Sequence, residues 1–157
     1  MEPRPKFLAD EMLGSLARWL RIAGYDTVYA KDLSDSEVLA LAKREGRFLL
    51  TRDIQLAGRA GRDGLLIKSP VLDEQMEQVI AAFQLTLEEQ LTRCTVCNGP
   101  LRTVGPEAVA DKVPERVREA NAEFFVCQDC GQVYWKGSHW RHIEEKLKSF
   151  RSDSSPR

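Results

Sequence analysis

Short apolar runs alternate with amphipathic segments over the first 83 residues of the chain. The apolar runs are KFLA (6–9), TVYA (27–30), RFLLT (47–51) and GLLIK (64–68). Their length and their β-branched, aromatic and aliphatic content are typical of strands. The intervening segments repeat apolar residues every three or four positions, as on one face of a helix. This alternation predicts a mostly parallel sheet with helices on both faces.

The helical segments also carry recognisable ends. In the segment 34–46, Ser34 and Glu37 have capping-box spacing and Gly46 provides a stop. Gly24 stops an earlier helix, and Asp53 precedes a short turn of sequence IQLAGRA. The apolar stripes of the first helix and of the segment 72–83 consist of Leu13, Leu16, Ala17 and Leu20, and of Met76, Val79, Ile80 and Phe83.

Length and composition set broad limits. The chain has 157 residues, 43% hydrophobic and 30% charged, which suits one domain with a small appendage. No run approaches the roughly 18 apolar residues of a membrane span, and MEPRPKF at the start is unlike a signal peptide. We therefore expect a cytoplasmic protein. Residues 1–92 carry a net charge of −3 and residues 93–157 one of +2, too slight a difference to indicate nucleic-acid binding by itself.

All four cysteines lie in the second half, as the pairs CTVC and CQDC separated by 29 residues. Two such pairs predict a closed tetrahedral zinc site, formed by Cys94, Cys97, Cys127 and Cys130. Two disulfides or one redox-active pair are the alternatives. Gly99 and Gly131 are expected to accept positive φ in the two knuckles. The long spacer predicts an insertion, in which Pro114 opens a short helix.

Acidic residues follow the first three predicted strands. Asp10 and Glu11 come directly after the first strand, and Asp53 follows the third. The loop and first helical turn after the second strand contain Asp32, Asp35 and Glu37. In an open parallel sheet the carboxyl ends of the strands form one edge, where sites are built. Crowded carboxylates raise one another's pKa values, so a shared Mg²⁺ or Mn²⁺ ion is the natural compensation.

Each acid also has a purely structural interpretation. Asp10, Glu11 or Asp53 can cap a helix or interact with its dipole, and Glu37 fits the capping box. The coincidence of Asp10 and Asp53 at one edge favours a functional site for this pair. Asp35 is not needed for capping and is the freer candidate of the second loop.

Taken together, FLADEMLGSLARWLRIAGYDT, SDSEVLALAKREGRFLLTRD, the two C-x-x-C pairs and VYWKGSHWRHI resemble the Mut-seven C-terminal RNase domain family over residues 6–147. The resemblance implies a PIN-like three-layer α/β sandwich with a C-terminal zinc ribbon, and metal-dependent cleavage of RNA. It places the acidic site on Asp10, on Asp35 or Glu37, and on Asp53. PIN nucleases usually have a further acid near the fourth strand, where this chain has Asp63 before the strand and Asp73 beyond Pro70.

Basic and aromatic residues are candidates for contact with RNA. Arg18 and Arg21 lie off the apolar stripe of the first helix and are expected to face solvent, and Arg52 adjoins Asp53. In VYWKGSHWRHI, three aromatic residues alternate with the basic residues Lys136, His139, Arg141 and His142. That pattern can stack bases and bind phosphates. The structural alternative is that Trp135 or Trp140 packs the ribbon on the sheet, which we expect for at least one of them.

These features predict a metal-dependent ribonuclease acting on single-stranded RNA, with a structural zinc and a catalytic Mg²⁺ or Mn²⁺. The expected division is a PIN-like domain at 1–92, a zinc ribbon with a docking helix at 93–148 and a disordered tail at 149–157. A non-catalytic RNA-binding protein and a toxin-like protein-interaction module are the alternatives. The oligomeric state stays open.

Overall fold

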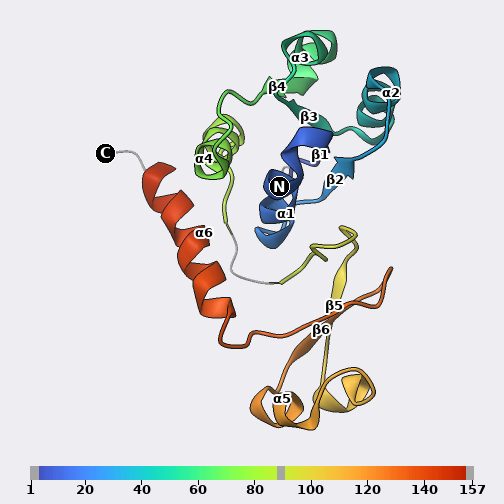
Figure 1. The fold of residues 1–157 in the computed structure, drawn as a ribbon, viewed down its shortest axis with the longest axis vertical. Helices are drawn as coiled ribbons and strands as arrows, with labels where there is room; N and C mark the ends of the chain where they lie inside the picture. Colours follow the sequence, from blue (N-terminus) through green and yellow to red (C-terminus); the bar gives the residue numbers. More distant parts are fainter. Residues whose placement is uncertain (1–3, 88–90, 155–157) are drawn as a thin grey trace.

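A computed structural model of the chain describes residues 4–87 and 91–154. Its N-terminal part alternates strands and helices as the sequence pattern predicts (Figure 1). The elements are β1 (Phe7–Asp10), η1 (Glu11–Leu13), α1 (Gly14–Ile22), β2 (Thr27–Ala30), α2 (Asp35–Glu45), β3 (Phe48–Thr51), α3 (Ile54–Ala60), η2 (Gly61–Asp63), β4 (Gly64–Leu66) and α4 (Leu72–Phe83).

The four strands form a parallel sheet in the order β2-β1-β3-β4. Leu8 of β1 pairs with Val28 of β2 on one side and with Leu49 of β3 on the other. Because all four strands run in the same direction, their carboxyl ends meet at one edge. Asp10 is the last residue of β1 and Asp53 lies two residues beyond the end of β3, so both acids belong to this edge.

Alternate residues of β1 and β3 pack on opposite faces of the sheet. Phe7 and Leu50 belong to a core shared with α1 and α4, whereas Leu8 and Leu49 belong to a second core shared with α2 and α3. The predicted mixed α/β fold, with a mostly parallel sheet covered on both faces, is therefore confirmed. The capping box of Ser34 and Glu37 is also present, and α2 ends at Gly46 with φ of +64°.

The C-terminal part contains a second, antiparallel sheet of β5 (Leu101–Val104), β6 (Phe124–Cys127) and β7 (Val133–Tyr134). The insertion between the two cysteine pairs holds η3 (Pro106–Val109) and α5 (Glu115–Ala120), which begins directly after Pro114 as expected. Two small apolar clusters, one around Trp140 and one around Phe124, stabilise this part of the chain.

Helix α6 (Trp140–Ser154) returns from the small sheet and runs beside α4 (Figure 1). Leu147 and Phe150 are buried in the core of the N-terminal part, and the Phe150 ring meets Trp19 edge-on at 5.8 Å. Residue 149, expected to begin a disordered tail, lies inside this helix, because burial of Phe150 extends the helix beyond 148. Residues 155–157 of that tail are outside the described residues. None of the helices in the described ranges has the length and apolar content needed to cross a membrane.

Candidate active site and metal centre

Asp10 and Asp53 are joined through the side chain of Thr51. The Thr51 hydroxyl, fully buried at the end of β3, donates to Asp10 Oδ2 over 2.8 Å and accepts the Asp53 backbone N–H over 3.0 Å. Asp10 Oδ1 accepts the Glu11 N–H at 2.7 Å. Asp10, through its carboxylate, and Asp53, through its backbone N–H, are thus joined in one hydrogen-bonded unit at the sheet edge. The sequence reasoning missed Thr51, although its position two residues before Asp53 is typical of a side chain that bonds a nearby backbone N–H.

Asp53 also caps α3. Its Oδ1 accepts the N–H groups of Gln55 and Leu56, at 2.9 and 3.1 Å. Neither bond uses Oδ2, which receives no hydrogen bond from residues in the described ranges. The capping interpretation is therefore correct for Asp53, yet it leaves one exposed carboxylate oxygen at the carboxyl edge.

The other predicted acids stand in different surroundings. Glu37 receives the Ser34 N–H at 3.1 Å, and this bond, followed by the one involving the Ser34 side chain, lowers the pKa of Glu37. Asp35 is exposed in the first turn of α2 with no partner among the described atoms, and Glu11 is exposed after β1. Asp32, also exposed, adopts φ of +61° in the loop after β2. The role of each acid in a metal site stays a prediction.

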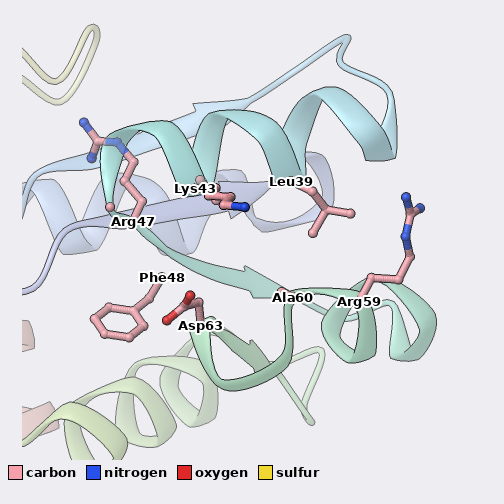
Figure 2. A pocket seen from close by; sticks show the side chains of 9 residues that line it. Leu39, Lys43, Arg47, Phe48, Arg59, Ala60 and Asp63 are labelled. Atoms are coloured by element: carbon pink, nitrogen blue, oxygen red, sulfur yellow. The ribbon is translucent and has the colours of Figure 1, made fainter.

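The two acids near the fourth strand have other surroundings: Asp73 lies in the first turn of α4, after the carboxyl end of β4, and Asp63 lies before that strand. Asp73 forms an ion pair with Lys146 of α6 at 2.6 Å. Asp63 precedes β4 and lines a cavity of about 430 Å³ between α2, β3 and α3. Figure 2 shows this cavity, with Lys43 on α2, Arg59 on α3 and Asp63 beside Phe48. Since Phe48 starts β3, the cavity lies toward the amino ends of the strands, away from Asp10 and Asp53.

Three predicted RNA contacts lie on the N-terminal domain. Arg18 is exposed as expected, and Arg52 is partly buried, with its Nη2 donating to the Lys68 carbonyl at 3.4 Å. Arg21, expected to face solvent, is instead only 8% exposed. Its guanidinium donates to the backbone carbonyls of Thr27 and Thr95, at 2.8 and 2.9 Å, because the first cysteine knuckle covers this side of α1. Arg21 is thus a structural link and not a surface group.

The four cysteines converge on one point. Cys94 Sγ and Cys130 Sγ are 3.7 Å apart, Cys97 Sγ and Cys127 Sγ are 3.4 Å apart, and all four sulfur atoms lie within 4.8 Å of one another. Sulfur atoms in a tetrahedral zinc shell with bonds of about 2.3 Å are roughly 3.8 Å apart. All four thiols are free. This donor set can therefore hold a metal ion such as zinc. In the described ranges, these four cysteines are the group of three or more potential metal ligands that lie close enough to share one ion.

One of the two glycines expected to have positive φ in the cysteine knuckles does not have it. Gly131 has φ of +80°, as expected, but in the first knuckle the residue with positive φ is Asn98, at +73°. Gly99 is needed for a different reason. A Cβ at this position would lie 2.7 Å from Asp129 Oδ2 and 2.9 Å from Cys127 Sγ, so no side chain fits there.

The surroundings of Cys94 lower the pKa of its thiol. Burial raises its pKa, but hydrogen bonds from Tyr134 and from the backbone of Cys97 and Val96 outweigh burial and lower the pKa to about 7. The Tyr134 hydroxyl lies 3.1 Å from Cys94 Sγ and also accepts the Thr95 N–H at 3.2 Å. Metal ligation requires the thiolate form, so this environment favours binding of a cation.

The first knuckle is tied to the amino edge of the large sheet. Asn98 Oδ1 accepts the Thr27 N–H at 2.9 Å, and its Nδ2 donates to Asp26 at 2.6 Å. Asp26 also pairs with Arg47 at 2.7 Å. Thr27 is the first residue of β2, so the cysteine site and the acidic edge lie at opposite ends of the sheet.

The remaining candidates belong to the C-terminal segment. Trp140 is only 4% exposed and packs with Leu91 and Phe125, so one tryptophan has a packing role as expected, but inside the C-terminal part and not between the ribbon and the large sheet. Lys136, His139 and Arg141 are exposed. The structure brings His139 close to Arg18, since both line one small cavity, and does not bring it to the acidic edge.

Comparison with known families gives a match to the Mut7-C RNAse domain over residues 5–147. Searches of curated proteins and of solved structures found no match. The family match spans the parallel sheet, the acidic edge, both cysteine pairs and most of α6. A nuclease-like role is what this family indicates. The chain belongs to the Mut7-C RNAse domain family.

Proposed function

We propose that this protein is a metal-dependent ribonuclease whose site surrounds Asp10 and Asp53. The observation that carries the proposal is the hydrogen-bonded unit of Asp10, Thr51 and Asp53 at the carboxyl edge of the parallel sheet. Membership in an RNase domain family supports it. The position also agrees with the general placement of sites in open α/β sheets.

The residues at this edge fit a hard divalent cation. Asp53 presents an oxygen that accepts no hydrogen bond from the described ranges, and the Thr51 hydroxyl links the Asp53 backbone N–H to the Asp10 carboxylate. Mg²⁺ typically takes one or two carboxylates and completes its shell with water and substrate phosphate, so a compact cage of acids is not required. Asp35 is our candidate for a third carboxylate, because it is exposed and the neighbouring Glu37 is held in its capping box. A bound Mg²⁺ or Mn²⁺ would polarise the phosphodiester and acidify a water molecule.

The residues of the chain supply orientation. Thr51 holds one oxygen of Asp10, and the first turn of α3 holds Oδ1 of Asp53, so both carboxylates keep fixed directions. Arg52, which follows Thr51 and is anchored to the Lys68 carbonyl, is placed to contact a phosphate of single-stranded RNA.

We also propose that the four cysteines hold a structural zinc. A closed shell of four thiolates leaves no position for water, so this ion would stabilise the fold and take no part in cleavage. Its position at the opposite end of the sheet supports that division of roles. Elemental analysis of freshly reduced protein should find about one zinc per chain. Protein without zinc that melts at the same temperature as the loaded form would contradict this proposal.

Cleavage of single-stranded RNA with and without Mn²⁺ tests the ribonuclease. Asp10→Asn and Asp53→Asn should each abolish Mn²⁺-dependent cleavage. Without metal, Asp53→Asn should melt near the parent temperature, because asparagine also caps helices, whereas Asp10→Asn should melt somewhat lower, because its amide replaces an oxygen that accepts a hydrogen bond. Asp53→Ala should lose activity and also about 1 kcal/mol of stability, because it loses the helix cap.

Asp63→Asn is the matched control, because this acid lies on the amino side of the sheet, and it should cleave like the parent. Cleavage by Asp10→Asn at the parent rate would show that the acidic site is assigned wrongly. A parent protein that binds RNA without cleaving it would favour the non-catalytic RNA-binding alternative, and one that does neither would favour a protein-interaction module.

A further inference from the structure

A small cavity of about 130 Å³ lies where α1, α6 and the segment between them that carries the four cysteines (residues 91–139, the cysteine module) meet. Its walls are aromatic and aliphatic, and two basic side chains share them. The lining includes Arg18, Ile22, Tyr134, Trp135, His139 and Trp140. These residues come from distant parts of the sequence, so the cavity exists only when the C-terminal module is docked on α1.

The aromatic rings of this cavity are held in place before any ligand arrives. The Tyr134 hydroxyl accepts the Thr95 N–H, and Trp140 is buried in its own apolar cluster. Trp135 packs on Phe124 with ring centroids 6.1 Å apart and stays partly exposed. Gly137 allows the tight arrangement, since a Cβ there would lie 3.0 Å from Trp135 Nε1 and 3.4 Å from His139 Cε1. Trp135 and Tyr134 are therefore the partly exposed aromatic rings of the cavity, whereas Trp140 is buried.

The charge of the cavity complements an anion. Arg18 and His139 are exposed where they line it, and Arg141 is exposed close to His139 in the sequence. A planar aromatic group stacks on Trp or Tyr, and an arginine binds phosphate well. A ligand that combines both features is a nucleotide. The cavity has room for one ring system, which excludes a base pair.

We propose that this cavity binds one unpaired nucleobase of an RNA strand, with an adjacent phosphate at Arg18. The proposal rests on the proposed function insofar as RNA is the substrate. Arg18 lies on α1, eight residues after Asp10, and η1 and the first turn of α1 separate the two residues. The bound base would accordingly belong to a nucleotide near the cleaved linkage and not to the linkage itself.

Titration of the ¹⁵N-labelled full chain with 5′-AMP, 5′-UMP and ribose 5-phosphate, without divalent metal, tests the proposal. The nucleotides should shift the Trp135 and Trp140 indole signals and the Gly137 amide in a saturable manner. Ribose 5-phosphate should not. Trp135→Leu should weaken nucleotide binding about 5- to 150-fold, the range expected for loss of one stacking ring. Arg18→Gln should weaken binding of 5′-AMP but not of adenosine.

Controls separate the cavity from the fold and from the acidic edge. Trp19→Phe and Arg116→Gln, which change a tryptophan and an exposed arginine outside the cavity, should bind nucleotides like the parent. Gly137→Ala moves the Trp135 and His139 rings without deleting them, and it should weaken binding even if Trp135→Leu does not fold.

Absence of saturable shifts, equal shifts with ribose 5-phosphate, or unchanged binding by both Trp135→Leu and Gly137→Ala would overturn the proposal. Asp10→Asn should bind nucleotides with the parent affinity, because it leaves the cavity intact. Nucleotide binding without RNA cleavage in the parent would therefore refute the ribonuclease alone, and cleavage without nucleotide binding would refute the cavity alone.

Discussion

Thr51, fully buried at the end of β3, donates a hydrogen bond of 2.8 Å to the carboxylate of Asp10 at the end of β1. The same hydroxyl accepts the backbone N–H of Asp53. One small side chain thus joins the Asp10 carboxylate to the backbone of Asp53, the second acid on which the proposed activity depends. Because Thr51 is buried and makes both hydrogen bonds through its hydroxyl, a substitution that removes only the hydroxyl tests its role.

Thr51→Val keeps the shape of the side chain and removes the hydroxyl. We expect it to lower the free energy of unfolding by about 1 to 3 kcal/mol, since the Asp53 N–H loses its buried partner. We also expect a higher Mn²⁺ concentration for half-maximal cleavage, because Asp10 is no longer held. Thr51→Ser, which retains the hydroxyl, should restore the metal dependence of the parent. Equal metal dependence of the valine and serine variants would contradict a role for this hydrogen bond.

Arg21 joins α1 to the first cysteine knuckle. Arg21→Met should lower the free energy of unfolding by about 2 to 3 kcal/mol, because buried carbonyls at Thr27 and Thr95 lose a charged donor. Zinc should also leave this variant faster when a chelator is added. Urea unfolding and chelator competition measure the two effects. Arg18→Met, one turn earlier and exposed, should change stability by less than about 0.5 kcal/mol, and matching losses in the two variants would refute the link.

Asp26 connects Arg47 with Asn98 and carries a pH-dependent share of stability. Burial raises the pKa of Asp26, but hydrogen bonds from Arg47 and Asn98 outweigh burial and lower the pKa below its ordinary value. A lowered pKa in the folded state stabilises the protein above the unfolded pKa, about 3.9. That contribution is lost as the pH falls through the folded pKa.

Asp26→Asn should therefore reduce the free energy of unfolding by about 1 to 2 kcal/mol at pH 7. The difference from the parent should shrink as the pH falls below about 4. Urea unfolding of both proteins across this range gives the comparison. A stability difference that stays constant from pH 7 to pH 3 would show that the charge of Asp26 is not responsible.

Phe150 secures α6 against the N-terminal domain. It is 1% exposed and lies beside Trp19, so Phe150→Ala should cost about 3 to 5 kcal/mol. Lys148→Ala, on the exposed side of the same helix, is the control and should have little effect on unfolding. A chain ended at residue 148 should melt like Phe150→Ala. Parent-like melting of that shortened chain would show that the end of α6 is dispensable.

Local sequence patterns were sufficient for the elements of the N-terminal part and for their order. The capping box of Ser34 and Glu37, the stop at Gly46 and the helix 72–83 agree with the structure, because each depends on residues within one or two turns. The two cysteine pairs were equally informative, since ligand type and spacing nearly specify a tetrahedral site. The meeting of Asp10 and Asp53 at one edge followed from the parallel order of the strands.

Contacts between residues of distant segments could not be predicted from local sequence patterns. The pattern of α1 placed Arg21 beside Arg18 on a solvent-facing side, but docking of the knuckle buried Arg21 and left Arg18 exposed. The approach of Gly99 to Cys127 has the same origin, since it depends on how two distant segments pack.

For residues 6–83 the sequence by itself determined which segments are strands and helices, and it determined which cysteines converge, because these properties arise from short-range periodicity, capping and ligand spacing. Only the tertiary structure decided that Thr51 joins Asp10 to Asp53, that Lys146 of α6 pairs with Asp73, and that α1, the cysteine module and α6 enclose a cavity. Each of these contacts joins residues from separate segments. Their distance and orientation follow from side-chain packing in the whole fold, which local spacing does not encode.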